Sequence, residues 1–251
     1  MKHFHYFLLL AFTFLYSCKK DNQGDGKCKV TSIGYTFNSQ IHSDGIVNYD
    51  EHGNLSGMTS SSEATFPSFS LEYLQDTVKI FSRENDYIYP LNAQGKVTKV
   101  LFQAISFNYG SDGFIESMTI DRDRLKFSYH EGNLVKITQE KYLPYLFKTT
   151  FTFTYNLNEK AVDLLSATNP LYYSLPHPIL LPNTRYFGNT SKNQLKSVEI
   201  LTEDTYYQTK QVSTYNLSYK TESKKITSLH LIENILGKKS DKLYDFKYEC
   251  E

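Results

Sequence analysis

One phrase occurs twice, 20 residues apart, in the middle of the chain: FNYGSDGFIESM at residues 107–118 and FSYHEGNLVKI at residues 127–137. Each copy begins with alternating aromatic side chains, passes through a glycine-bearing turn, and ends with two aliphatic residues three positions apart. Alternation with a period of two is typical of a β-strand, and glycine tolerates the backbone conformation of a tight turn. The phrase predicts a β-hairpin junction, and its repetition predicts a sheet built from hairpins.

Weaker copies extend this prediction to most of the chain. They lie near Val47, Tyr89, Phe153 and Tyr219, and an aromatic strand at residues 244–248 ends the series. The aliphatic pairs after the turns pose a separate question, because side chains three apart face opposite ways in a regular strand. A β-bulge at each site, or a twisted two-sided strand, resolves it. The pairs are Leu55/Met58, Val97/Val100, Ile115/Met118, Leu134/Ile137, Leu195/Val198 and Ile226/Leu229.

The predicted fold is all-β. Hairpin repeats over residues 28–251 form a single domain, in which a strongly curved antiparallel sheet makes an incomplete or closed barrel. The length is within the range of one all-β domain.

The first 17 residues have the anatomy of a signal peptide. Lys2 precedes an apolar run over residues 6–16 that is too short to span a bilayer. The sequence LYSC at residues 15–18 resembles the lipobox of bacterial lipoproteins. It implies acylation of Cys18, which tethers the protein to the outer membrane without crossing it. Residues 18–27 are polar and glycine-bearing, which predicts a flexible tether. The side of the membrane that the protein faces stays open.

Two cysteines remain for the folded part, Cys28 and Cys250. Alternation places Cys250 on the same face as Tyr244, Phe246 and Tyr248, which we expect to be buried. An extracytoplasmic location permits a disulfide between the two, which requires the first and last strands to be neighbours. Two buried free thiols are the alternative.

Residues 158–190 break the pattern. Asn158 is placed to cap a short helix over residues 161–165. Four prolines between residues 170 and 182 exclude a central strand, and the apolar residues between them exclude a free linker. We predict a long loop that plugs or covers one face of the sheet, or that contacts a partner or ligand. The residues predicted for this contact are Leu171, Tyr172, Tyr173, Leu175, Ile179 and Leu180.

The sequence YDEHGNL at residues 49–55 resembles the YD-type repeats of bacterial surface proteins. With LYSC, it makes the chain similar to lipoproteins of Bacteroides-type bacteria that carry a repeat domain of unknown function with a porin-like fold. The sequence FGNTSKNQL at residues 187–195 is similar to a segment that follows the proline-rich insertion there. The resemblance covers most of residues 30–248, although several turn glycines and a proline after Leu195 are missing. It implies a curved sheet or incomplete barrel and no known activity.

The tripeptide Asp76-Thr77-Val78 resembles the O-glycosylation site of such bacteria, which implies a glycan on Thr77.

Charge and motifs restrict the classes of function. Removal of Lys2 with the signal leaves 26 basic against 27 acidic residues, so the net charge gives no reason to expect nucleic acid. The stretches His42-Ser43-Asp44 and Asp50-Glu51-His52 have metal-ligand chemistry, but their spacing favours solvated turns. We expect no metal, no cofactor and no catalytic motif.

We therefore predict a non-enzymatic envelope protein that binds or organises an unknown protein or glycan. One alternative is a carrier of an apolar ligand inside an aromatic-lined sheet, with residues 171–181 as its lid. Another is an extracellular hydrolase whose residues only the fold brings together.

Overall fold

The computed structural model of the chain describes residues 28–61, 68–82, 86–101, 104–141, 147–161, 170–173, 184–187, 189–223 and 225–250. The predicted signal peptide, tether and lipidated Cys18 lie outside these residues. The chain divides into two compact units. The larger, Val30–Tyr248, carries the sheet, and the described residues of the smaller are Cys28, Lys29, Glu249 and Cys250.

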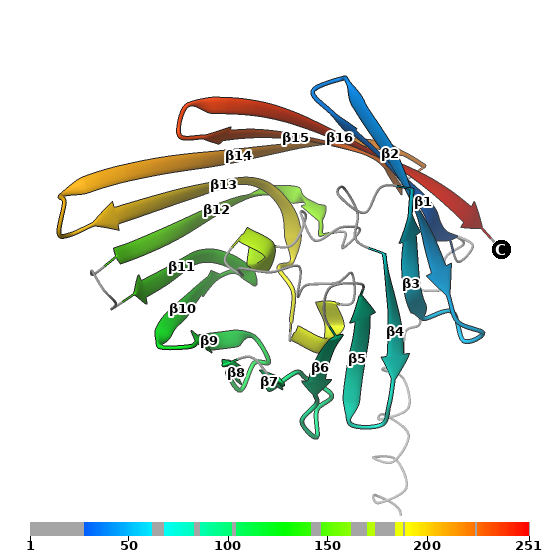
Figure 1. Cartoon of the computed structure of the whole chain (residues 1–251), viewed down its shortest axis with the longest axis horizontal. Coiled ribbons are helices and arrows are strands. Elements are labelled where there is room, and N and C mark those ends of the chain that lie inside the picture. Colours follow the sequence, from blue (N-terminus) through cyan, green and yellow to red (C-terminus); the bar gives the residue numbers. More distant parts are fainter. Residues whose placement is uncertain are drawn as a thin grey trace, which may run out of the picture. The chain divides into compact units, whose positions relative to one another are not determined.

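One antiparallel sheet of 16 strands dominates the larger unit (Figure 1). Its order is β6-β5-β4-β3-β2-β1-β16-β15-β14-β13-β12-β11-β10-β9-β8-β7. Strands that are consecutive in sequence therefore pair, except β6 and β7 at the two edges, and the first strand pairs with the last. The strands are β1 (Cys28–Phe37), β2 (Ile41–Tyr49), β3 (Leu55–Ser60), β4 (Phe69–Tyr73), β5 (Thr77–Ser82), β6 (Asp86–Pro90), β7 (Lys99–Val100), β8 (Ile105–Tyr109), β9 (Ile115–Ile120), β10 (Asp123–His130), β11 (Asn133–Lys141), β12 (Phe147–Lys160), β13 (Asn193–Asp204), β14 (Thr209–Glu222), β15 (Lys225–Ile235) and β16 (Lys238–Cys250).

The two edge strands, β6 and β7, meet and nearly close the sheet into a barrel. A single bridge joins Leu91 to Val97, and the Leu101 N–H donates to the Ile88 carbonyl at 2.9 Å. β7 has only two residues, so in the described chain this seam is not sealed by a continuous ladder. The all-β prediction of an incomplete barrel is confirmed.

Bulges explain the aliphatic pairs after the turns. Tyr109 pairs with Ile115 and Asn108 pairs with Ser117, so Glu116 is the extra residue. The extra residue turns both Ile115 and Met118 toward the core, where each is 1% exposed. The same register shift occurs at Leu55/Met58, Leu134/Ile137, Leu195/Val198 and Ile226/Leu229. The bulge prediction is confirmed at these five sites.

The glycine corners of the phrase are hairpin turns, as predicted. Gly113 has a φ of +83°, and a Cβ there would lie 2.5 Å from the Lys96 ammonium nitrogen. Glu131 and Gly132 both have positive φ, at 49° and 81°, which fits a two-residue hairpin turn. These conformations suit glycine because it has no Cβ, so they set the register of the strands on either side.

A tyrosine hydroxyl links most of the hairpins at the same end of the sheet. In each case the last tyrosine of an even-numbered strand bonds to the backbone near the start of the preceding strand. The bonds are Tyr49 to Val30, Tyr73 to Leu55, Tyr109 to Val97, Tyr155 to Leu134, Tyr219 to Leu195 and Tyr248 to Ile226. Each of these tyrosine hydroxyls therefore donates to a backbone carbonyl of the preceding hairpin arm.

These tyrosines predict unfolding at alkaline pH. Burial raises the pKa of Tyr155 and Tyr219 above the ordinary value of 10.0, and it raises the pKa of Tyr248 to about 12. Their stabilisation is complete below pH 10 and is lost above it, because the unfolded chain releases these protons first. Between pH 10 and their raised pKa values, Tyr155 and Tyr219 each contribute a slope of about 1.4 kcal/mol per pH unit, and the more exposed Tyr248 contributes less. We expect tyrosinate absorbance to appear together with loss of the β-sheet circular dichroism. Ionisation of all tyrosines near pH 10 with the sheet intact would contradict this.

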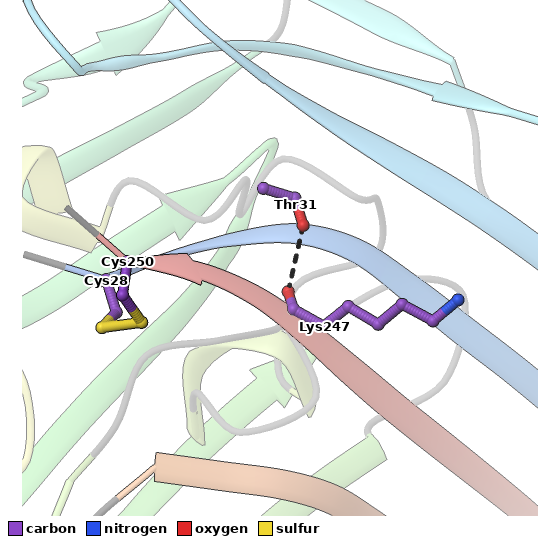
Figure 2. The surroundings of a disulfide bond; sticks show 4 residues. All are labelled: Cys28, Thr31, Lys247 and Cys250. Atoms are coloured by element: carbon purple, nitrogen blue, oxygen red, sulfur yellow. Dashed lines mark hydrogen bonds between the residues drawn. A yellow bond between two sulfur atoms is a disulfide. The ribbon is translucent and has the colours of Figure 1, made fainter.

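The predicted disulfide joins Cys28 to Cys250 across 222 residues of sequence (Figure 2). The Thr31 hydroxyl donates to the Lys247 carbonyl at 3.4 Å, one of the contacts between β1 and β16 (Figure 2). The first and last strands are neighbours, as the disulfide prediction required.

The prediction that Asn158 caps a short helix is wrong, because Asn158 lies in a strand. β12 continues through Lys160, and Lys160 pairs with Asn193 of β13. The Asn193 amide also donates to the carbonyls of Leu157 and Glu159, at 2.9 and 3.2 Å. These bonds supply the partners that a helix would otherwise provide. The rest of the predicted helix, residues 162–165, lies outside the described residues.

Candidate functional site

Aromatic side chains of the insertion fill one end of the concave face. The insertion contributes two short 3-10 helices, η2 (Pro170–Tyr173) and η3 (Thr184–Phe187), which Figure 1 shows inside the curve of the sheet. The Phe187 ring lies edge-on to Tyr89 and Phe107, with centroids 5.9 and 5.5 Å away. Tyr186 stacks on Tyr73 of β4 at 6.0 Å. In this part of the chain, the insertion acts as the plug that the sequence predicted.

The chain leaving the plug crosses the turns of successive hairpins. We call residues 186–193 the strap; residue 188 lies outside the described chain. Every third residue of the strap makes a backbone hydrogen bond to the next turn. The bonds are Val97 N–H to Tyr186 O at 2.7 Å, Asn189 N–H to Gly113 O at 3.0 Å, and Lys192 N–H to Gly132 O at 2.9 Å. The strap overlaps the FGNTSKNQL sequence at residues 187–195, and its backbone hydrogen bonds join the plug to the turns.

Buried amides fix the end of the strap. The Asn133 side chain donates to the Asn193 side chain at 3.0 Å, and its own oxygen accepts the Asn193 backbone N–H at 2.9 Å. The Ser191 hydroxyl accepts the Leu134 N–H at 3.1 Å and lies 3.0 Å from the Tyr155 hydroxyl. Buried polar groups with complete partners specify one arrangement.

Outward positions on β10 are polar: Arg124, Lys126 and Ser128 are exposed, whereas the alternating Leu125 and Phe127 are buried. Large apolar side chains are exposed on other strands, among them Ile46 at 57% and Phe81 at 39%. No helix in the described ranges is long and apolar enough to cross a membrane.

At the other end of the barrel, the concave face becomes polar. Glu233 follows buried Leu231 by two positions and faces the same way; its side chain is 12% exposed. Its carboxylate accepts hydrogen bonds from the Lys242 ammonium group at 2.7 Å and from the Ser240 hydroxyl at 2.9 Å. This places a satisfied ion pair on a face that is apolar elsewhere.

Two more polar contacts lie on the same face. Gln139, opposite buried Leu125, donates to the Asp123 carboxylate at 3.1 Å. The Thr149 and Thr202 hydroxyls lie 3.5 Å apart across β12 and β13. We call this set the polar band, and its members are Asp123, Gln139, Thr149, Thr202, Glu233, Ser240 and Lys242.

Tyrosine rings border the polar band. Tyr35 and Tyr244 lie 5.1 Å apart between ring centroids, and Tyr215 lies 4.9 Å from Tyr173 of η2. All four are half-buried. A concave surface with aromatic faces and a few fixed polar groups is the ordinary composition of a ligand site.

A hollow lies on the outward face. It is a groove of about 320 Å³ across β1 and β14–β16. The His230 Nε2 lies 2.6 Å from an Asp241 carboxylate oxygen there, and the Ser218, Ser228 and Thr36 side chains contribute hydroxyls. No enzymatic site is evident among the described residues.

The residues predicted from sequence have different positions. Tyr173 contacts the sheet, and Leu171 and Tyr172 lie with it in η2, whereas Leu175, Ile179 and Leu180 lie outside the described residues. Thr77 begins β5, and its hydroxyl donates to Asp76 at 3.1 Å; its glycosylation stays a prediction.

The Asp50 carboxylate, from the cluster with metal-ligand chemistry, accepts the His52 and Asn54 N–H groups of its own turn. The Asn54 hydrogen bond lowers the Asp50 pKa. The described residues contain no group of three or more potential metal ligands.

The polar band is not among the sites predicted from the sequence. Its signal was a polar residue at an inward position: Glu233 continues the alternation of Leu229 and Leu231, and Lys242 continues that of Phe246 and Tyr244.

The fold resembles solved porin-like structures. A porin-like protein from Bacteroides vulgatus aligns with a TM-score of 0.59 at 11% identity, over 88% of this chain and 98% of that one. A porin-like protein from Bacteroides uniformis aligns with a TM-score of 0.52 at 15% identity, with the same coverage. No protein-family model and no curated protein matches the chain. At these identities the likeness concerns the fold.

Proposed function

We propose that this chain is a non-enzymatic binding protein of the bacterial envelope, whose ligand occupies the polar band. The observation that carries the proposal is the Glu233 carboxylate with its Lys242 and Ser240 partners on the concave face. Partly buried charges that keep fixed hydrogen bonds give orientation and specificity to a bound polar molecule.

The ligand class that fits best is a glycan. Sugar rings have apolar C–H faces that stack on tyrosine, and their hydroxyl groups exchange hydrogen bonds with carboxylate, amide and hydroxyl side chains. The polar band provides the hydrogen-bonding groups, and the rings of Tyr35, Tyr215 and Tyr244 provide the stacking surfaces. An apolar ligand is less well served, because Phe187 and Tyr186 already occupy the apolar end of the concave face.

A glycan array and calorimetric titration test this function. We expect the full chain to bind a subset of glycans, and the Glu233→Gln variant to bind them about tenfold more weakly, because a charged hydrogen bond is lost. Glu199→Gln is the matched control, since Glu199 is exposed on the outward side of β13. Absence of glycan binding, or equal loss in both variants, would contradict the proposal.

The proposed location rests on the lipobox-like LYSC sequence at residues 15–18. Acyl chains on Cys18 anchor the protein at the outer membrane. Metabolic labelling with palmitate and cell fractionation test this: wild type is labelled and sediments with membranes, and Cys18→Ser is not labelled. An unlabelled wild type would contradict the anchor and leave the binding proposal standing.

A further inference from the structure

Large apolar side chains are exposed at the tips of two long hairpins. Tyr206 and Tyr207, in the turn between β13 and β14, are 66% and 61% exposed, and their rings lie edge to face with centroids 4.8 Å apart. Leu236, in the turn between β15 and β16, is 61% exposed. Exposed apolar side chains that cluster mark an interaction surface.

Both tips lie at the same end of the sheet. The β13–β14 hairpin extends further, because its last pair is Asp204 with Thr209, whereas β14 and β15 pair only as far as Ser213 and Ile235. Val212 and Ile235 near this last pair are also exposed, at 48% and 40%. The exposed apolar side chains therefore belong to two separate tips. They lie at the end opposite the strap and the glycine turns, because successive strands alternate in direction.

The backbone of one tip is fixed by its own hydrogen bonds. The Asp204 carboxylate accepts the N–H groups of Tyr206 and Tyr207 at 2.8 and 3.0 Å. The tyrosine rings are thus held outward on a shaped turn.

Lysines flank the apolar tips. Lys238 and Lys239 follow Leu236 by two and three residues and are exposed. Lys210 on the other hairpin forms an ion pair with Glu203 at 2.7 Å. Tyrosine and leucine beside lysine suit the boundary of a bilayer. Tyrosine places its ring at the level of the headgroups, leucine enters the acyl region, and lysine reaches anionic phosphates.

We propose that Tyr206, Tyr207 and Leu236, with Lys238 and Lys239, form a tip surface that docks to an anionic lipid bilayer. Two narrow tips offer far less than the roughly 800 Å² per partner of a standard protein interface. Their narrow shape suits insertion into the headgroup region of a bilayer, and the ammonium groups of Lys238 and Lys239 complement anionic headgroups. The proposal does not depend on acylation or on the polar band.

The chain has no tryptophan, which allows a direct test. Full-length Tyr207→Trp carries one tryptophan at the tip surface. His130→Trp is the matched control, because the His130 side chain is 76% exposed and lies at the opposite end of the barrel. Each variant is mixed with vesicles of phosphatidylethanolamine and phosphatidylglycerol that contain acyl-brominated lipid. We expect the Tyr207→Trp emission to shift to shorter wavelength and to be quenched, while the control is unchanged.

A second series tests the lysines and the leucine. Leu236→Ser lowers vesicle affinity about tenfold, as expected when one leucine-sized side chain no longer leaves water. Lys238→Glu with Lys239→Glu abolishes the preference for anionic over phosphatidylcholine vesicles. Equal quenching at both tryptophans, or none at the tip, would overturn the proposal. An emission shift of Tyr207→Trp that grows with protein concentration in the absence of vesicles would also overturn the proposal, because the tips would then contact a second copy of the chain.

Discussion

Replacing Cys28 and Cys250 together with serine is expected to lower the free energy of unfolding by about 5 kcal/mol. The bond closes a loop with a sequence separation of 222 residues, and loss of so long a loop restores much conformational freedom to the unfolded chain. Urea unfolding followed by circular dichroism measures the change. We expect the midpoint to fall and the native spectrum to persist in the absence of urea.

The Cys18→Ser variant is the control, and we expect its urea midpoint to match that of wild type. Reducing agent is expected to lower the wild-type midpoint to that of the double variant. Detection of the Cys28 and Cys250 thiols as free sulfhydryls in denatured, unreduced protein would contradict the disulfide.

Phe187→Ala is expected to destabilise the barrel by about 3–5 kcal/mol. Phe187 is 7% exposed and packs edge-on to Tyr89 and Phe107, so its removal leaves a cavity between the plug and the sheet. The plug also lies beside the seam between β6 and β7, where Tyr186 accepts the Val97 N–H. Loss of the ring therefore weakens closure of the sheet as well as packing.

Phe81→Ala provides a comparison of the same chemistry on the outside of β5, where the ring is 39% exposed. We expect this change to cost at most about 1 kcal/mol. Similar midpoints for the two variants in urea would show that the insertion does not stabilise the barrel.

The repeat made most of the fold predictable. The phrase around Tyr109–Met118 contains the capping tyrosine, the turn glycine and the two aliphatic residues of one junction, all within a short segment. The bulges were predictable from local sequence. Ile115 and Met118 are three positions apart, and both can face the core within one strand only if the strand contains an extra residue. Alternation in the last strand predicted the face of Cys250, and the disulfide prediction required the first strand beside it; Cys250 itself is exposed and not buried as expected.

The rest depends on contacts between distant residues. Asn158 favours a helix cap by its type, but the bonds from Asn193 to Leu157 and Glu159 keep the backbone in the sheet. The path of the strap is set by one bond at each turn, which leaves no periodic signal in the sequence. The polar band combines residues more than 100 positions apart, from Asp123 to Lys242, and becomes visible only when the sheet curves.

The central claim is that aromatic side chains of the insertion plug one end of the concave face of this porin-like fold and leave the polar band at the other end for a ligand. Conductance across a planar lipid bilayer tests it most directly. The account predicts no stepwise current after addition of the purified full chain, for wild type and for Phe187→Ala alike. Regular single-channel steps that depend on the protein would contradict it.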